Sequence, residues 1–196
     1  MMRNENMIYT CTYKSMLGDI LLASDETGLT GLWFEGQKYF ANTLPEEHIS
    51  QETEILAEAK KWLDIYFAGK EPKFTPPLHP NGSAFRQAVW KILLQIPYGQ
   101  TITYGEIARQ LAKMQNVPHM SAQAVGGAVG HNEVSIIIPC HRVVGVNGSL
   151  TGYAGGIDKK NCTAETGTHR YETFICSKER NYIVIDECLN VKFYED

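Results

Sequence analysis

A cysteine and a histidine stand side by side in the run Pro139-Cys140-His141-Arg142. The run follows an apolar stretch, 134–138, that is typical of a strand, and Pro139 would end the strand because proline cannot donate to a β-ladder. The pattern predicts a thiol at the end of an element, where a substrate can reach it. Because a thiolate is strongly nucleophilic, this thiol is a candidate for nucleophilic catalysis.

The adjacent histidine is a candidate base for that thiol. A free thiol has a reference pKa of about 8.5, so at neutral pH it needs a neighbouring base or cation to react. In an extended chain the side chains of Cys140 and His141 would point apart, so a contact between them requires a bend or a bridging water. An isolated Cys-His pair is more often a buried inert cysteine beside a structural histidine, and the surrounding residues must decide.

Length and composition restrict the class of protein. The 196 residues suffice for one or two domains with a hydrophobic core. No apolar run is long enough to span a bilayer, and residues 1–6 lack the apolar segment of a signal peptide, so we expect a cytoplasmic protein without a membrane partner. The 5 cysteines are irregularly spaced and include no CxxC pair, which predicts neither a disulfide framework nor a metal site.

The net charge of −4 is unevenly distributed along the chain. Lys and Arg number 7 against 12 Asp and Glu in residues 1–80, 7 against 3 in residues 81–160, and 4 against 7 in residues 161–196. The basic excess therefore lies in the segment that carries Cys140. Because attraction to phosphate is local, this distribution favours a nucleic-acid contact in that segment.

Strands, a helix and a linker are expected in the first part of the chain. Segments rich in β-forming residues predict strands joined by hairpin turns, and apolar residues at helical spacing predict a helix that stops before Gly69. A proline-rich stretch predicts a linker, and we place a domain boundary there. The expected strands are 7–13, 20–24 and 29–34, the turns 17–19 and 26–28, the helix 52–67 and the linker 72–82.

Three helices are expected after the linker. Ser83 is a plausible N-cap for the first helix, and Thr103 and Glu106 form the pattern of a capping box at the start of the second. Pro118 breaks the chain before a short helix over 121–130, and this order predicts a helix-turn-helix. The expected buried face of the first helix is Phe85, Val89, Trp90, Leu93 and Leu94.

The helix over 121–130 is unusual for a DNA-reading helix. It has no Arg or Lys to bind guanine edges in the major groove. Its small residues would let the backbone approach a minor groove closely, and they would equally let the helix pack tightly against a neighbour. The spacing leaves these two interpretations open.

Taken in order, the motifs resemble those of the O6-alkylguanine-DNA alkyltransferases, or methylated-DNA–protein-cysteine methyltransferases. The resemblance covers residues 85–160 closely and residues 7–75 more loosely. It implies an α/β (α+β) fold with an N-terminal ribonuclease-H-like three-stranded sheet and helix, and a C-terminal winged-helix-like helix-turn-helix domain. The motifs that carry it are PYGQTITYG at 97–105, AVGGA at 124–128, Asn132, PCHRV at 139–143 and GYAGG at 152–156.

The resemblance implies DNA repair by a reaction that each molecule performs once. The alkyl group on O6 of guanine would pass by direct displacement to the sulfur of Cys140, with no cofactor and no metal. The expected partner is double-stranded DNA containing O6-alkylguanine, with O4-alkylthymine as a further candidate, and the protein is expected to be a monomer. The target base must be flipped out of the duplex, at a cost of a few kcal/mol.

The resemblance also assigns roles to individual residues. His141 would take the thiol proton through a water, Asn132 would support the turn and the histidine network, and Tyr104 would help rotate the nucleotide and protonate the leaving guanine. Each of these residues also has a plain structural interpretation, as a packing or turn residue. The expected lining of the guanine pocket is Val143, Tyr153, Ala154 and Gly155, and the expected DNA contacts are Thr103, Gln123, Ala124, Gly130 and Arg142.

Two positions near Asn132 depart from the family pattern. Gly130 stands where we place an arginine of the family that fills the gap left by the flipped base, so another side chain would have to fill it. Glu133 stands where proline is common. An acid beside a turn that faces DNA would weaken the contact with phosphate modestly.

A larger departure begins at residue 161. The family continues here into a helix with paired leucines and a glutamate that orients the histidine, but this chain has Thr163, Ala164 and Gly167 at those positions. Codons for residues 161–182 that are read one nucleotide later can restore the leucines and the glutamate. We therefore divide the chain into an N-terminal domain (1–80), a DNA-binding and alkyl-acceptor domain (81–160) and an atypical tail (161–196), for which a frameshift is our hypothesis because the codons permit it without requiring it.

Alternative functions follow from these departures and from the Cys-His pair. The altered tail would leave a weakened or inactive binder of alkylated DNA, and the pair alone would also suit a thiol hydrolase, which turns over esters or peptides. A lesion binder of the same fold without an acceptor cysteine is disfavoured by Cys140. A transcription regulator that senses alkylation would usually carry a cysteine-rich zinc domain, which this sequence lacks.

Overall fold

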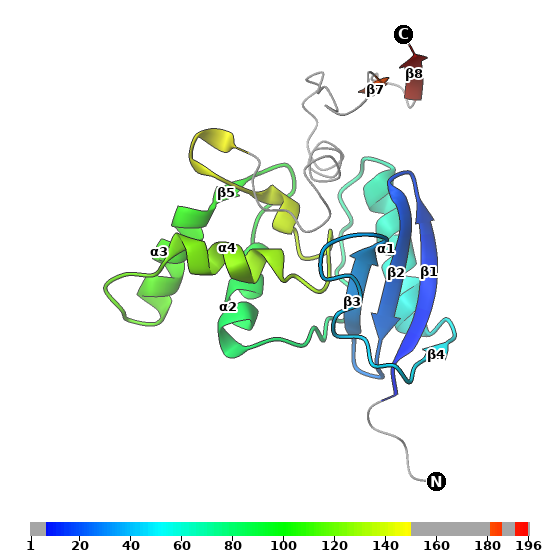
Figure 1. Cartoon of the computed structure of the whole chain (residues 1–196), viewed down its shortest axis with the longest axis horizontal. Helices are drawn as coiled ribbons and strands as arrows, with labels where there is room; N and C mark the ends of the chain where they lie inside the picture. Colours follow the sequence, from blue (N-terminus) through cyan, green and yellow to red (C-terminus); the bar gives the residue numbers. More distant parts are fainter. Residues whose placement is uncertain (1–6, 150–180, 186–190, 196) are drawn as a thin grey trace.

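The computed structural model describes residues 7–149, 181–185 and 191–195 (Figure 1). Within residues 7–149, a sheet with one helix against its face lies beside a helical domain (Figure 1). The elements are β1 (Tyr9–Ser15), β2 (Gly18–Ser24), β3 (Leu29–Phe34), β4 (Ile49–Ser50), α1 (Glu54–Phe67), α2 (Ala84–Leu93), β5 (Ile102–Thr103), α3 (Tyr104–Met114), α4 (Ala122–Gly130), the 3-10 turns η1 (Cys140–Arg142) and η2 (Val146–Gly148), β6 (Val143–Val144), β7 (Asn181–Ile185) and β8 (Val191–Glu195).

The N-terminal sheet has the strand order β3-β2-β1-β4. β1, β2 and β3 form an antiparallel meander, as the sequence predicts, and Gly18 takes the left-handed φ of +101° that the first hairpin turn requires. The expectation of three strands is corrected by β4, which pairs parallel to β1 over two residues. A strand this short carries no alternation of apolar and polar residues by which sequence could reveal it.

α1 begins two residues later than the sequence predicts and ends at the predicted residue. The hydroxyl of Thr53 accepts a hydrogen bond from the Leu56 N–H and caps the helix, and Gly69 ends it at a φ of +72°. One side of the helix is buried against the sheet, as the helical spacing indicates. The buried residues are Leu56, Ala59, Trp62, Leu63 and Tyr66.

The expected linker, residues 72–82, contains no helix and only a single bridge to the sheet. The Leu29 N–H donates to the Pro77 carbonyl at 2.7 Å, and the His79 N–H donates to the Leu29 carbonyl at 2.8 Å. The linker therefore runs along the edge of β3 and is fixed to it. This contact sets the direction in which the chain enters α2.

α2 is capped by Ser83, and its buried face differs from the prediction at two positions, Phe85, which is only partly buried, and Leu94. Val89, Trp90 and Leu93 are buried as expected, whereas Leu94 is 42% exposed. Leu94 is the C-terminal cap, so the turn of the chain rather than the helix sets its direction. Ile92 is buried instead.

α3 and α4 form the predicted helix-turn-helix. The capping box between Thr103 and Glu106 is present at the start of α3, and Ser121 caps α4. α4 packs against both α2 and α3. The indole N–H of Trp90 donates to the Ala128 carbonyl at 3.1 Å and ties α2 to α4.

The chain after α4 is paired with the edge of β3 in the N-terminal domain. The Leu32 N–H donates to the Glu133 carbonyl at 2.8 Å, and the Ser135 N–H donates to the Leu32 carbonyl at 3.0 Å. The Glu133 carboxylate accepts from the Trp33 indole at 3.0 Å and from the Thr43 hydroxyl at 3.1 Å. Glu133 is thus buried between the two domains, which corrects the expectation that it faces DNA.

The remaining described segments, β7 and β8, pair with each other in antiparallel register. The expected pocket residues Tyr153, Ala154 and Gly155, and the tail positions Thr163, Ala164 and Gly167, lie outside the described residues. Among the helices that the structure describes, none is both long enough and apolar enough to cross a bilayer.

The buried carboxylate of Glu133 leads to a first prediction. Burial raises the pKa of Glu133, so the folded state binds its proton more tightly than the unfolded state, and this residue's contribution to stability falls as pH rises through the two pKa values. Glu133→Ala leaves the Trp33 indole without its acceptor and should lower the free energy of unfolding by about 1–3 kcal/mol. Glu133→Gln keeps an acceptor oxygen and should lose less than half as much, with a weaker pH dependence. Urea denaturation at pH 5 and pH 8 measures both effects, and equal losses in the two variants would contradict the assignment.

Candidate active site

The apolar stretch before Cys140 forms turns rather than the expected strand. The Ile137 N–H donates to the Ser135 carbonyl at 2.8 Å, which closes a three-residue turn. Ile136, at the centre of this turn, takes a φ of +68°, a strained conformation for a β-branched residue. The expectation of a strand over 134–138 is therefore wrong, because a largely apolar run indicates burial and does not distinguish a strand from buried turns.

A second tight turn, centred on Pro139, positions Cys140. Pro139 has φ −79° and ψ 61°, and the Cys140 N–H donates to the Ile138 carbonyl at 2.7 Å across it. The 3-10 turn η1 begins at once, closed by the Arg142 N–H on the Pro139 carbonyl at 3.0 Å. The bend that the Cys-His pair was expected to require is thus present, and the two side chains leave a turn and not an extended chain.

The side-chain amide of Asn132 holds these turns together. Its Nδ2 donates to the carbonyls of Val134 and Ile138, at 3.2 and 2.8 Å, and to the sulfur of Cys140 at 3.0 Å. Its Oδ1 accepts from the Val134 N–H at 3.1 Å. A donor directed at sulfur favours the thiolate over the thiol. These hydrogen bonds are the contacts by which Asn132 can support the turn, and its amide also contacts the Cys140 sulfur.

Cys140 is 3% exposed, so the expectation that a substrate can reach it directly is wrong for this structure. His141 is fully buried beside it. A buried thiol with a donor on its sulfur is shielded from bulk water and from oxidants in solution. A substrate must therefore be brought to the thiol, which suits a base that is extruded from a duplex better than a freely diffusing small molecule.

His141 has a partner from the N-terminal domain. Its Nε2 lies 2.9 Å from the hydroxyl of Tyr66, which is in the last turn of α1, and the two rings are 6.0 Å apart in an edge-on arrangement. Both residues are fully buried. The sequence assigned Tyr66 only to the core. A tyrosine on a buried helix face needs a partner for its hydroxyl, and this requirement is the signal that could have pointed to it.

Arg142 lies inside the protein and not on a DNA-facing surface as expected. It is 7% exposed, its guanidinium lies 5.2 Å from the ring centre of Tyr98, and it donates to the Ile96 carbonyl at 3.4 Å. Burial raises the pKa of Tyr66, while the neighbouring Arg142 opposes this effect. Tyr66 therefore remains a neutral phenol at physiological pH, and Arg142 supplies the positive charge of this buried cluster.

Two short parallel strands bring Tyr104 toward the cysteine turn. Ile102 pairs with Val143 and Thr103 with Val144, so the start of α3 lies beside the chain that leaves η1. Val143 is buried. The Thr103 hydroxyl donates to the Glu106 carboxylate at 2.8 Å, and the hydrogen bonds from Thr103 hold the pKa of Glu106 below its usual range.

The small residues of α4 divide into a packed group and an open group. A Cβ at Gly126 would lie 3.8 Å from the Tyr104 ring, whereas Cβ atoms at Gly127 and Gly130 would meet nothing within 4 Å. Gln123 and Ala124 are exposed in the first turns of the helix. A Cβ at Gly126 would make only an ordinary van der Waals contact, so packing requires glycine at none of these three positions, and Gly127 and Gly130 leave a bare helix face that another backbone or a nucleic acid could approach.

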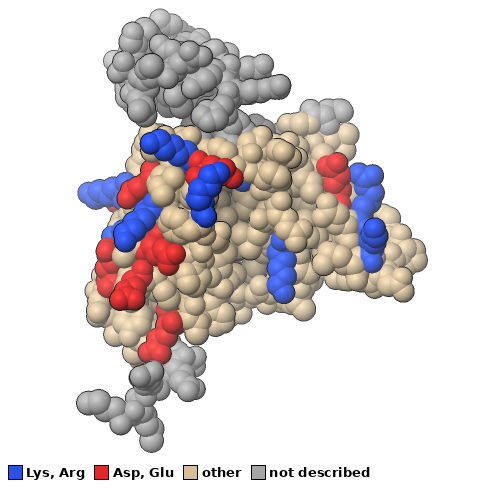
Figure 2. Space-filling model, turned by 180° about the vertical axis from the view of Figure 1, so that it is seen from behind, with Lys and Arg blue, Asp and Glu red and all other residues tan. Residues whose placement is uncertain are grey.

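Charge is sparse over the helical domain. On the face that Figure 2 shows, side chains of both signs crowd over the N-terminal domain, whereas the helical domain carries few, most of them Lys or Arg. Residues 84–149 contain 5 Lys and Arg against 2 Asp and Glu, and one of those acids is the buried Glu133. The exposed charge of this domain is therefore weakly positive, as a contact with phosphate requires.

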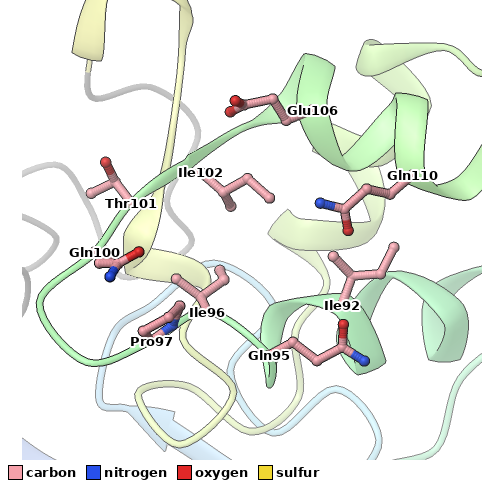
Figure 3. A pocket seen from close by; sticks show the side chains of 9 residues that line it. All are labelled: Ile92, Gln95, Ile96, Pro97, Gln100, Thr101, Ile102, Glu106 and Gln110. Atoms are coloured by element: carbon pink, nitrogen blue, oxygen red, sulfur yellow. The ribbon is translucent and has the colours of Figure 1, made fainter.

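A cavity of about 290 Å³ lies between α2, α3 and the loop that joins them (Figure 3). It does not include Cys140, His141 or Asn132, and it adjoins the cysteine turn only through Ile96 and Ile102, which also contact that turn. Its lining combines three isoleucines with amide side chains, and it contains no cysteine or histidine. The lining residues are Ile92, Gln95, Ile96, Pro97, Gln100, Thr101, Ile102, Glu106 and Gln110.

Comparison with known proteins identifies relatives over most of the chain. Residues 8–80 match the family model of the 6-O-methylguanine DNA methyltransferase ribonuclease-like domain, and residues 84–166 match that of the DNA binding domain. A methylated-DNA–protein-cysteine methyltransferase of Methanosarcina acetivorans is 43% identical over 154 residues, which is 78% of this chain and 94% of the relative. The protein of the same name from Haemophilus influenzae is 40% identical, over 78% of this chain and 82% of the relative.

Solved structures agree with this relationship. The crystal structure of Mycobacterium tuberculosis OGT in complex with DNA matches with a TM-score of 0.70 and 38% identity, over 82% of this chain and 96% of that one. The Mycobacterium tuberculosis O6-methylguanine methyltransferase matches with a TM-score of 0.69 and 39% identity, over 85% and 96%. The fold of mixed sheet and helical domain is therefore shared with proteins of one family.

The donor amide of Asn132 leads to a second prediction. Asn132→Ala removes four buried hydrogen bonds and should lower the free energy of unfolding by about 2–4 kcal/mol. Asn132→Asp keeps the acceptor oxygen but loses the donors, so it should be at least as destabilised. The exposed Asn81→Ala serves as the control and should change stability by less than about 0.5 kcal/mol. Chemical denaturation measures all three, and wild-type stability in Asn132→Asp would show that the donors do not hold the turns.

Proposed function

The chain belongs to the 6-O-methylguanine DNA methyltransferase family, and we propose that it repairs DNA by transferring an alkyl group from O6 of guanine to Cys140. The observation that carries the proposal is the buried Cys140 thiol, which is held at 3.0 Å by the Asn132 amide and flanked by His141. The partner is double-stranded DNA containing O6-alkylguanine, with O4-alkylthymine as a further substrate candidate. We place the protein in the cytoplasm as a monomer.

The reaction balances within the residues of the turn. His141 takes the proton of the Cys140 thiol, directly or through a water, and the Asn132 amide stabilises the thiolate that forms. The sulfur then attacks the alkyl carbon, a carbon–sulfur bond forms, and the carbon–oxygen bond breaks with its electron pair left on guanine. Guanine takes up one proton, for which Tyr104 is the proposed donor; exchange with solvent then removes the proton from His141 and restores that of Tyr104, so no net proton is gained or lost. No cofactor enters this balance.

The product explains why each molecule acts once. A thiolate is a poor leaving group from an alkyl carbon, so the thioether is stable, and no residue of the proposed mechanism regenerates the thiol. The buried position of Cys140 further protects the alkylated sulfur from a second nucleophile. The amount of repaired DNA should therefore equal the amount of protein, which separates this function from that of a thiol hydrolase with turnover.

We propose that α4 is the element that lies against DNA. Its open face, with Gln123, Ala124 and Gly130, suits close approach to the narrow minor groove, and Tyr104 stands at its packed side, toward the cysteine turn. Val143 would line the pocket of the flipped base. Thr103 would contact DNA only through atoms left free by its capping box. Arg142 is reassigned to the buried cluster with Tyr66.

A third prediction concerns the acceptor. Cys140→Ser should abolish the removal of methyl groups from a duplex that contains O6-methylguanine, because an alcohol is a far weaker nucleophile than a thiolate. Cys11→Ser removes the other free thiol of the described residues and should leave repair unchanged. Chromatography of the DNA bases after incubation measures both. Repair by Cys140→Ser, or its loss in Cys11→Ser, would overturn the assignment.

A fourth prediction concerns the DNA contact. Ala124→Glu places an acid on the exposed face of α4 and should weaken duplex binding about 3–10-fold at low salt, with a smaller loss at high salt. Gln51→Glu makes the same change of charge at an exposed position beside β4 and should have no such effect. Fluorescence anisotropy at 50 and 300 mM salt, about the range over which phosphate contacts are screened, compares the two. If both variants weakened duplex binding equally, the effect would come from the overall charge of the protein and not from a contact between α4 and DNA.

A further inference from the structure

Tyr66 reaches the reacting residues from the opposite domain. Its hydroxyl lies 2.9 Å from Nε2 of His141, although the two residues are 75 positions apart in the chain. Tyr66 belongs to α1 in the N-terminal domain, and His141 to η1 in the helical domain. Both are fully buried, so the contact is formed away from solvent, where a hydrogen bond of good geometry is strongest.

The phenol ring of Tyr66 is fixed by its neighbours. Its ring stacks on Trp62 with centroids 5.1 Å apart, and it meets the rings of Phe67 and Tyr98 edge-on at 5.9 and 6.3 Å. Such pairs are the preferred arrangements of aromatic side chains. The packing of the ring therefore fixes the position of the hydroxyl, so its contact with His141 costs little further side-chain entropy. A group that orients another side chain needs to be fixed in this way.

The contact sets which nitrogen of His141 can accept a proton. Neutral imidazole carries its single proton on one ring nitrogen, and the partner of that nitrogen selects it. When the phenol oxygen accepts the N–H at Nε2, Nδ1 is left as the basic atom, whereas a hydroxyl that donates to Nε2 would place the proton on Nδ1. After His141 has taken up a proton, the same oxygen still accepts from Nε2–H and so stabilises the imidazolium.

We propose that Tyr66 is a positioning residue for the alkyl transfer: it holds His141 with the proton on Nε2, so that Nδ1 can accept the proton of the Cys140 thiol. The inference rests on the proposed function. The titratable and charged groups around His141 include Cys140 and Arg142 on η1, Tyr66 on α1 and Tyr98 on the loop after α2. Of these, Tyr66 is the one that contacts the imidazole at Nε2.

Loss of the hydroxyl should have a recognisable pH dependence. Without the acceptor, the state with a thiolate and an imidazolium becomes less populated relative to the state with a thiol and a neutral imidazole. At neutral pH the reaction depends on that state, whereas well above the ordinary thiol pKa of about 8.5 the thiol ionises without help from His141. The defect should therefore be large near pH 7 and should narrow as the pH rises.

The test compares Tyr66, which belongs to α1, with Tyr13, which contacts α1 from β1. Tyr66→Phe removes only the hydroxyl at His141, and Tyr13→Phe removes a hydroxyl that donates to Asp64 of α1 at 2.9 Å near the surface. Single-turnover rates with O6-methylguanine duplex should fall about tenfold for Tyr66→Phe at pH 7 and by less than about threefold at pH 9.5. Affinity for the duplex should be unchanged, and Tyr13→Phe should match the wild type at both pH values.

Each outcome separates the inference from the proposed function. No transfer by the wild-type protein would refute the proposed function itself. Transfer by the wild type with an equal rate in Tyr66→Phe, or a loss of equal size at both pH values, would refute the positioning role alone, because a purely structural defect does not change with thiol ionisation. In the His141→Gln background, Tyr66→Phe should produce no further pH-dependent loss.

A measurement on the wild-type protein covers the case in which Tyr66→Phe folds poorly. Nitrogen-15 NMR of the imidazole side chains, with the His141 signals assigned by their absence in His141→Gln, reports which ring nitrogen carries the proton. The proposal predicts the Nε2–H form for neutral His141. The Nδ1–H form would overturn it, since Tyr66 would then be a donor and Nδ1 could not take the thiol proton.

Discussion

The side-chain amide of Asn132 reaches two carbonyls and one sulfur in a segment that has no regular helix or strand to hold it. Two tight turns and the left-handed Ile136 lie within this segment, and each costs free energy that the surrounding contacts must offset. The position of Cys140, the start of η1 and the register of β6 against β5 all follow from how this segment is folded. A strained turn held by one amide is stiff, and stiffness is what a nucleophile aimed at a single carbon requires.

Both domains build the surroundings of that turn. The N-terminal sheet pairs with this segment through Leu32, and the Trp33 indole N–H of the same sheet donates to the Glu133 carboxylate. Tyr66 of α1 contacts His141. The N-terminal domain therefore helps to build the site, because its strands and its helix each contact the segment that holds Cys140 and His141. A change at this interface should affect the thiol even where it lies far from DNA.

Local signals in the sequence were sufficient for the helices and for the three-stranded meander, but not for β4 or for the site. The capping box of Thr103 and Glu106 and the helical spacing of α1 act through neighbours in the chain, so sequence reveals them. The prediction of a strand over 134–138 was wrong because a turn that is buried on all sides has the same largely apolar sequence as a buried strand. Arg142 was misplaced, and the partner of the Tyr66 hydroxyl was missed, for a related reason: the partners of both residues lie far away in sequence, and only the packing of the two domains shows which polar atoms meet. The resemblance to a known family located Cys140, His141 and Asn132, and the structure supplied their geometry.

The central claim is that Cys140, and no other atom of the chain, receives the alkyl group in a stoichiometric reaction. Peptide-resolved mass spectrometry of the protein after incubation with an excess of O6-methylguanine duplex tests it directly. The account predicts a gain of one methyl group per chain, located on Cys140, with methyl removal from DNA ceasing when the protein is fully modified. Methyl groups on another residue, or continued repair by a chain with an unmodified Cys140, would contradict it.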